Sequence, residues 1–338
     1  MRQVWITAKG GPEVLQVREA ADPQAGRGEL RIRVEYAGVN FADVQARMGQ
    51  YPDCPPLPCV VGYEVSGLVD QVGAGVEGFA EGDRVVSLTR FGGYSDLAVV
   101  NPLWARKLPD NISFEVAAAI PVNYCTAWIM LVRQGNLKPD DTVLVHSAGG
   151  GVGIAALQIC KWVGARAVGT ASTGKHARLK EMGYAHCIDY LTQDFEREVM
   201  MYTNGRGVDI VLDAQGGHSF RKSYRTLAPL GKLFMFGAAS FAPGKTMDIF
   251  AVLKGMIAMP WFHPMPLLDK NRGVFGTNMG HLWDEFGRLR HDQDQILALV
   301  ADGTFAPVVD KVFSFDEAPA SHHYLQDRKN FGKVLLKP

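Results

Sequence analysis

The apolar and polar positions of the chain follow two different rhythms, and the first is that of β-strands. Residues 30–34 alternate apolar and polar side chains with a period of two, as half-buried strands do. Glycines punctuate the stretch between residues 62 and 93 at short intervals, which is typical of turns between strands. The first third of the chain is therefore predicted to form a small barrel or an irregular β-rich sheet.

The second rhythm begins at Thr142 and alternates strands with helices. Residues 142–146 form a short apolar run, and apolar side chains then recur at helical spacing from Val152 to Val163. Further apolar runs at 167–169, 208–212 and 233–236 are separated by polar segments of helix length. This order predicts right-handed crossovers and a doubly wound parallel sheet, hence an α/β fold class. From about His281 the tail predicts one helix and then strands at 308–315 and 334–336 that can return to the first domain.

Composition narrows the class of protein. A chain of 338 residues suits about two domains. Equal numbers of acidic and basic side chains, 35 of each, provide no field suited to nucleic acid. Residues 1–6 lack the apolar core of a signal peptide, and the five cysteines are odd in number and scattered. We therefore expect a cytoplasmic protein with reduced thiols and no nucleic-acid partner.

The most apolar late segment, residues 249–268, is interrupted by a lysine, a glycine, a histidine and three prolines. A transmembrane helix needs about 20 consecutive, mostly apolar residues, so this segment is not expected to span a membrane. Three interpretations stay open: packing at a domain or dimer interface, a lid over an apolar substrate pocket, or an exposed tip that faces lipid.

A glycine-rich turn at residues 148–153 lies between a predicted strand and a predicted helix. Glycines in this place let backbone N–H groups approach a pyrophosphate, whose charge the helix N-terminus favours. The βαβ context therefore predicts a dinucleotide site that includes Gly150, Gly151, Val152 and Gly153. The alternative is a tight turn in front of an empty helix end.

The end of the next predicted strand decides which dinucleotide is expected. NAD sites place an acidic residue about 20 residues after the glycines, where it holds the ribose 2′-hydroxyl. Here no acidic residue occurs between Gly153 and Glu181, and the loop offers Ser172, Lys175, His176 and Arg178. A hydroxyl and cations suit a 2′-phosphate, so NADPH is predicted. The alternative is that the basic residues only form the solvated face of the next helix.

Several motifs together resemble the zeta-crystallin-type quinone reductases, a zinc-independent group of the medium-chain dehydrogenase/reductase superfamily. They are residues 37–43, 123–128, 146–153, 169–171 and 188–190, and the resemblance continues to residues 332–336. Within the group, residues 123–128 and 271–276 look most like the vesicle amine transport protein branch.

The resemblance implies a GroES-like catalytic domain formed by residues 1–122 and 278–338. It also implies a Rossmann NADPH-binding domain formed by residues 123–277, and a dimer joined through the cofactor domains. By the same resemblance, Ser172, Lys175 and Tyr190 bind the 2′-phosphate. Asn40 and Thr126 contact the nicotinamide end, Phe236 and Gly237 line the cofactor groove, and Arg328 matches a basic cofactor contact of some members.

No metal is predicted. Tyr63 stands where zinc-dependent relatives carry a histidine ligand, and the closely spaced cysteines of a structural zinc lobe are missing. Cys54 and Cys59 bracket a proline-rich segment, but no further ligand lies close to them in sequence, so a metal clip is only the alternative interpretation. The adjacent His322 and His323 are expected at the surface.

Without a Lewis acid, alcohol oxidation is disfavoured, whereas hydride addition to a quinone or conjugated enone needs only hydrogen-bond donors at the acceptor oxygen. Asn40 and Tyr51 are the candidate catalytic donors, and Tyr51 matches the active-site tyrosine of the resembled family. The alternatives are a helix N-cap for Asn40 and a packed hydroxyl for Tyr51. Asp43 is expected to orient Arg47 or a loop.

The sequence thus predicts a zinc-independent NADPH:quinone or enone reductase with a small-molecule substrate. An enoyl-thioester reductase is the enzymatic alternative. A protein of low turnover that keeps the cofactor fold and associates with lipid membranes is the alternative from another class, although a membrane partner is not the expected one.

Overall fold

The computed structural model describes residues 1–338, and contacts within the chain divide them into two compact units. The first unit comprises Met1–Cys125, Gly244–Met247 and Met279–Pro338, and the second comprises Thr126–Pro243 and Asp248–Asn278. The domain limits predicted from the sequence differ from these units at residues 123–125, 244–247 and 278. That these limits separate a catalytic from a cofactor-binding domain stays a prediction.

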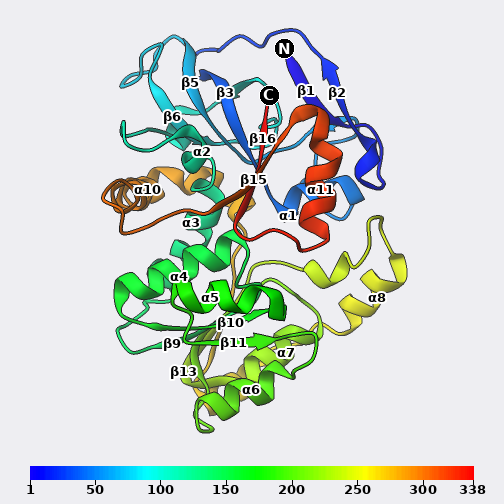
Figure 1. The fold of residues 1–338 in the computed structure, drawn as a ribbon, viewed down its shortest axis with the longest axis vertical. Coiled ribbons are helices and arrows are strands. Elements are labelled where there is room, and N and C mark those ends of the chain that lie inside the picture. The colour runs from blue at the N-terminus through cyan, green and yellow to red at the C-terminus, as the bar shows by residue number, and fades with distance from the viewer. The chain divides into compact units, whose positions relative to one another are not determined.

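The first unit is built on β-sheets (Figure 1). Its larger, seven-stranded sheet runs in the order β15 (Val309–Ser314), β16 (Lys333–Lys337), β3 (Leu30–Val39), β5 (Glu64–Val72), β6 (Arg84–Leu88) and β8 (Ala105–Lys107), with β7 (Leu97–Val100) paired to β3. A three-stranded sheet has the order β2 (Leu15–Glu19), β1 (Arg2–Ile6) and β4 (Cys59–Val60). Its helices are α1 (Phe41–Met48), α2 (Phe114–Ala117), α10 (Phe286–Ala301) and α11 (Ala318–Gln326). Helix α3 (Pro121–Trp128) crosses the limit between the units.

The predicted alternation in β3 is confirmed. Leu30, Ile32 and Val34 are buried, and Arg33 between them is exposed, because successive side chains of a strand point to opposite faces. The tail returns to this sheet as the sequence suggested: β16 lies antiparallel to β3, with Val334 opposite Val39. This pairing brings the last residues of the chain beside the start of α1, where the candidate Asn40 lies.

The second unit holds a six-stranded sheet in which every neighbouring pair is parallel. Its order is β11 (His186–Asp189), β10 (Arg166–Ala171), β9 (Thr142–Val145), β12 (Val208–Asp213), β13 (Leu227–Met235) and β14 (Gly273–Gly276). Helices α4 (Gly151–Val163) and α5 (His176–Met182) cover one face, and α6 (Phe195–Tyr202) and α7 (His218–Arg225) cover the other (Figure 1). The predicted doubly wound α/β fold is confirmed. The strand order reverses at β9, which is where ligands bind in such sheets.

The apolar segment that follows β13 forms two short helices, α8 (Ile249–Ile257) and α9 (Pro264–Lys270). Phe250 is 84% and Trp261 99% exposed in the single chain, and the three interpretations of this segment stay predictions. We call its exposed side chains the α8–α9 apolar surface: Ile249, Phe250, Leu253, Met256, Ile257, Trp261, Met265 and Leu268. No helix of the structure combines the length and apolar character of a membrane span.

Candidate cofactor-binding and active site

The glycine-rich turn joins the end of β9 to the start of α4 and is very tight. Ser147 adopts a left-handed conformation with φ of 57°, and the N–H of Gly150 donates to the Ser147 carbonyl at 2.8 Å. A Cβ atom on Gly153 would lie 2.5 Å from the carbonyl oxygen of Ala148. Only glycine therefore lets the first turn of α4 pack this closely on the strand end.

The N-terminus of α4 suits an anionic group. Gly150 is the N-cap, no side chain caps the helix, and the first turn contains no acidic residue. The first N–H groups of a helix lack partners within it, and the helix dipole favours negative charge there. The tight turn, the uncapped helix end and the switch point of the sheet together fit a dinucleotide pyrophosphate.

A buried polar network that the sequence reasoning missed supports this turn. Asp213, at the end of β12, accepts hydrogen bonds from the Ser223 hydroxyl at 2.7 Å and from the N–H of Gln215 at 2.7 Å. The Gln215 side chain donates to Ser147 at 2.8 Å, and His146 lies 3.0 Å from Ser223. Burial lowers the pKa of His146. The network connects the glycine turn to the end of β12. Among its residues only Asp213 had a signal in the sequence, because it is a polar residue at the end of a strand.

The predicted 2′-phosphate residues lie at neighbouring strand ends. Ser172 and Lys175 follow β10, Tyr190 follows β11, and the two strands align Ala171 with Asp189. All three candidate side chains are half-buried. They therefore lie at one edge of the sheet, on the side where the glycine turn also lies.

Asp189 is an acidic neighbour of this edge that the sequence reasoning did not single out. Its carboxylate accepts hydrogen bonds from the hydroxyls of Thr173 at 2.6 Å and Thr192 at 3.2 Å and from the N–H of Leu191 at 3.0 Å. The Thr173 hydrogen bond is the main cause of its lowered pKa. With these donors in place, the carboxylate fixes the loop that carries Ser172 and Lys175.

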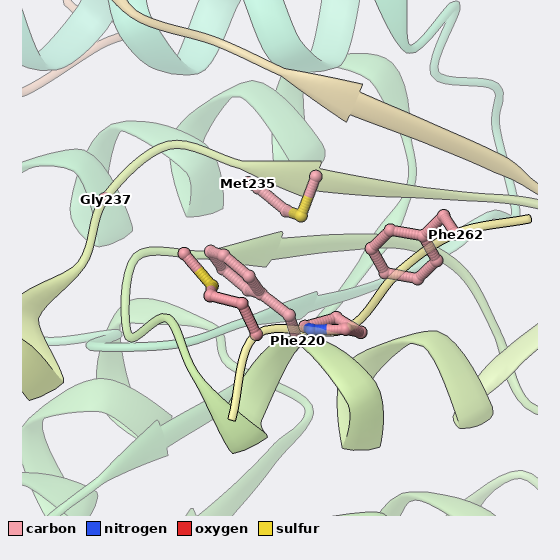
Figure 2. Close-up of a pocket in the computed structure, with 6 residues that line it drawn as sticks. Phe220, Met235, Gly237 and Phe262 are labelled. Atoms are coloured by element: carbon pink, nitrogen blue, oxygen red, sulfur yellow. The ribbon is translucent and has the colours of Figure 1, made fainter. Parts of the chain in front are cut away.

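Phe236 and Gly237 continue from β13 beside an apolar hollow of about 370 Å³. The hollow is lined by Phe220, Met235, Gly237, Met259, Pro260 and Phe262. Figure 2 shows the side chains of Phe220, Met235 and Phe262 around it. Thr126, the remaining candidate of this unit, is buried in α3. The second unit thus carries the predicted cofactor-binding residues except Asn40 and Arg328, which lie in the first unit. Arg328 is exposed and has φ of 55°.

Asn40, in the first unit, is held by a buried ion pair. Its Oδ1 accepts from Lys333 Nζ at 2.7 Å, and its Nδ2 donates to Glu64 Oε1 at 2.9 Å. Lys333 and Glu64 also bond directly to each other. The second N–H of the amide meets only the Gly38 carbonyl, at 3.4 Å. The amide is therefore fixed in orientation while one of its N–H groups has a long, weak partner and can donate elsewhere.

Tyr51 is half-buried at the edge of the core of the first unit, and its ring meets Tyr63 edge to face with centroids 6.1 Å apart. Burial raises the pKa of Tyr51, so its hydroxyl keeps its proton at neutral pH and can act as a donor. Tyr63 also packs against the rings of Phe91 and Trp283. No group of three or more His, Cys, Asp or Glu side chains is arranged to hold a metal ion.

Asp43 orients a loop and does not bond Arg47. Its carboxylate accepts from the N–H of Asn40 at 2.8 Å, the N–H of Gly62 at 3.1 Å and the hydroxyl of Tyr94 at 3.0 Å. Burial raises its pKa to about 7. Arg47 instead donates to the carbonyl of Gly10.

The expectation that His322 lies at the surface is wrong. Its side chain is fully buried, because the face of α11 that carries it packs against the core, and its Nε2 lies 3.4 Å from the Tyr94 hydroxyl. His323, on the next position of the helix, is half-buried and pairs with Glu13 at 2.6 Å.

Comparisons with known proteins agree with this architecture. Residues 26–110 match the alcohol dehydrogenase GroES-like domain, and residues 151–293 match the zinc-binding dehydrogenase family. The chain is 39% identical to the human synaptic vesicle membrane protein VAT-1 homolog, over all of this chain and 86% of that protein. It is 32% identical to a quinone oxidoreductase of Pseudomonas aeruginosa, over all of this chain and 99% of the relative.

Among solved structures, the Escherichia coli quinone oxidoreductase complexed with NADPH is similar over the full length of both chains, with a TM-score of 0.86 and 30% identity. Both the β-rich unit and the parallel-sheet unit thus have counterparts in one chain of known structure. The protein therefore belongs to the medium-chain dehydrogenase/reductase superfamily of oxidoreductases, in the group that holds the quinone oxidoreductases and the VAT-1 homologues.

Proposed function

We propose that the protein is an NADPH-dependent reductase that transfers a hydride to a quinone or a conjugated enone without zinc. The observation that carries this proposal is the end of β10, where Ser172 and Lys175 occupy the place of the acid that binds the ribose of NAD. The uncapped N-terminus of α4 at the adjacent strand supports it, as does the NADPH complex of the Escherichia coli relative.

The residues of the second unit divide the binding of the cofactor among them. Gly150, Gly151, Val152 and Gly153 would hold the pyrophosphate, because their backbone surrounds the uncapped helix end. Ser172, Lys175 and Tyr190 would hold the 2′-phosphate, with Asp189 fixing their loop through Thr173. Thr126 is proposed to contact the nicotinamide end, and Phe236 and Gly237 to line the cofactor groove. From the first unit, Asn40 is proposed as a second contact of the nicotinamide end and Arg328 as a further basic contact. When bound, NADPH supplies the hydride.

Asn40 and Tyr51 are proposed to stabilise the negative charge that develops on the acceptor oxygen. The phenol of Tyr51 remains protonated because burial raises its pKa. The amide of Asn40 is oriented by Lys333 and Glu64. A well-placed donor of this kind contributes about 3 kcal/mol of transition-state stabilisation. Reduction of a quinone or enone needs no stronger electrophilic catalyst than such donors. This agrees with Tyr63, which stands at the position of a zinc ligand.

A substrate panel tests the reaction. Purified protein is mixed with NADPH or NADH and with small quinones, conjugated enones or enoyl thioesters, and oxidation of the cofactor is followed by absorbance. We expect NADPH oxidation by quinones or enones, with NADH much poorer. Turnover of enoyl thioesters alone would instead indicate the enoyl reductase, in which Tyr51 gives a proton to the α-carbon after the hydride reaches the β-carbon. No turnover with any acceptor would refute the proposal.

The cofactor assignment has its own test in Lys175→Ala. The Lys175 ammonium would attract the 2′-phosphate, which NADPH carries and NADH lacks. Its loss should therefore raise the KM for NADPH at least about tenfold, while the KM for NADH stays nearly constant. The matched control is Lys180→Ala, which removes the same charge from an exposed position of α5. Equal effects of Lys175→Ala on both cofactors would remove the 2′-phosphate assignment.

The α8–α9 apolar surface favours a second candidate function, association with a lipid membrane. Phe250 and Trp261 stand exposed on it, and large apolar patches on soluble proteins mark interaction sites. The human relative is named a synaptic vesicle membrane protein. In a flotation assay with phospholipid vesicles, the native chain should float and Trp261→Ser should not, whereas Leu191→Ser, an exposed leucine outside the surface, should float like the native chain. Absence of flotation by the native chain rules this candidate out.

A further inference from the structure

Two of the five cysteines lie with their sulfur atoms in contact. Cys54 Sγ and Cys59 Sγ, in the first unit, are 3.7 Å apart, and both are free thiols. Cys54 is partly exposed. The other three cysteines are Cys125, Cys160 and Cys187, which are all buried, and burial raises the pKa of each. The pair thus differs from the other cysteines in the contact between its sulfur atoms, and Cys54 differs from them also in its exposure.

The local structure keeps the two sulfur atoms together. Cys59 begins β4 and is paired with Ile6 of β1, so its backbone is fixed by a sheet. Cys54 lies in the turn after Tyr51, and its N–H donates to the Tyr51 carbonyl at 3.1 Å. Three of the four residues between the cysteines are prolines, and each proline ring fixes one backbone angle. The segment therefore has few conformations in which the sulfur atoms could separate.

The surroundings of the pair make its two members unequal. The contact with Cys59 lowers the pKa of Cys54, opposed by partial burial and by the charge of Asp43, and Lys9 adds an attraction. The same contact and burial raise the pKa of Cys59. Cys54 is also the partly exposed member of the pair, whereas Cys59 is buried. An oxidant from solution therefore meets the Cys54 sulfur first, and Cys59 is the thiol that stands ready to resolve an oxidised Cys54.

We propose that Cys54 and Cys59 form a redox-active pair that hydroperoxides oxidise to an intramolecular disulfide. The Cys54 thiolate attacks the outer oxygen of the hydroperoxide, the O–O bond breaks, and the leaving alkoxide takes a proton to become an alcohol. The Cys59 sulfur then attacks the sulfenic acid of Cys54, the S–S bond forms, and hydroxide leaves with the thiol proton as water. In total, two thiols are oxidised and one hydroperoxide is reduced to an alcohol and water.

A metal clip is the competing interpretation of the same distance, because two thiolates on one zinc ion also lie close together. A structural zinc ion takes four ligands. No third His, Cys, Asp or Glu side chain joins this pair in a group that could hold a metal. Two sulfur atoms are all that a disulfide needs, but they are only two of the four ligands that a structural zinc ion takes.

Closure of the disulfide would also move the loop of Tyr51, a consequence that rests on the proposed function. The sulfur atoms must approach from 3.7 Å to about 2.05 Å. Because Cys59 is anchored in a sheet, the turn of Cys54 has to move, and the Tyr51 carbonyl is bonded to it. Displacement of a catalytic group by about 1 Å can lower a rate by about 100-fold. We therefore expect the oxidised protein to be a slower reductase that a dithiol restores.

The test counts thiols and so does not depend on any activity. Native protein is treated with hydrogen peroxide, denatured, and titrated with a thiol reagent, and we expect the five thiols to fall by the two of the pair. Trypsin leaves both cysteines in one peptide, residues 48–84, whose mass should fall by two hydrogens. In Cys59→Ser, Cys54 should stop at a sulfenic acid that dimedone traps. Cys187→Ser is the matched control and should still lose two thiols.

Loss of thiols from the buried cysteines, an unchanged peptide 48–84, or stoichiometric zinc in the purified protein would each overturn the pair. Activity separates this inference from the proposed function. A protein that closes the disulfide but reduces no acceptor keeps the inference and loses the proposed function. If peroxide slows the double variant Cys54→Ser, Cys59→Ser as much as the native enzyme, the link to Tyr51 is wrong while the disulfide stands.

Discussion

Lys333 is a lysine whose side chain is only 3% exposed, and its partner Glu64 is 0% exposed. Removing one member of such a pair leaves the other charge buried without compensation, at a cost of about 3–5 kcal/mol. We predict that Lys333→Met lowers the free energy of unfolding by this amount in urea denaturation. Lys337→Met, at an exposed position of the same strand, should change it by less than about 0.5 kcal/mol. A small loss in Lys333→Met, matching the control, would show that Glu64 finds another partner.

His322 makes the stability of the chain depend on pH. Burial lowers its pKa from 6.5 to about 3, so between these values the unfolded chain binds a proton that the native chain does not. Its contribution to stability is complete above pH 6.5 and is lost as the pH falls towards 3, with a slope of up to about 1.4 kcal/mol per pH unit.

The control for this pH dependence is His322→Gln, which keeps a polar side chain but removes the titration. Urea denaturation of both proteins at pH 4, 5, 6 and 7 measures the difference in slope. We expect the difference in stability between native and variant protein to narrow as the pH falls. Parallel pH profiles would mean that His322 takes up its proton as readily in the folded chain as in the unfolded one.

At the scale of the elements, the sequence predicted those whose signal is local. Strands β9, β10, β12 and β13 were found because each is an apolar run bounded by polar or glycine-rich segments, and α4 because its apolar spacing is regular. Strand β14 was missed. It has four residues, two of them glycine, and it is a strand because β13 offers it a ladder of partners, which is tertiary information.

The candidate sites divide in the same way. The glycine turn, Ser172 and Lys175 follow one another within a single βαβ unit, so spacing alone placed them. The partners of Asn40 come from far along the chain: Glu64 lies 24 residues away and Lys333 293 residues away. Nothing in the local sequence pairs such residues. Likewise, the contact of Cys54 with Cys59 depends on the pairing of β4 with β1. The sequence indicated only that the two cysteines flank a proline-rich segment.

At the scale of the whole molecule, we expect a binding partner to cover the α8–α9 apolar surface. A second copy of the chain is the partner that the family resemblance implies. Stable interfaces bury about 800 Å² on each partner around an apolar centre. Strand β14 follows this surface in the sequence and is the last strand of its sheet. The outer edge of β14 is therefore open to pairing with another strand. We predict a homodimer, visible as twice the chain mass of 37.0 kDa in light scattering after size exclusion.

A second copy of the chain and a membrane would each cover Phe250 and Trp261. A double variant of these two residues, compared with a control at Leu191, can therefore decide between the two partners. If Phe250 and Trp261 pack against a second copy, the double variant Phe250→Glu, Trp261→Glu should be a monomer, because carboxylates cannot be buried unpaired at an apolar centre. Leu191→Glu changes an exposed leucine outside this surface and should remain a dimer. A double variant that remains a dimer but no longer floats with vesicles would assign the surface to lipid instead. In that case the subunits must join elsewhere, with the open edge of β14 as the remaining candidate.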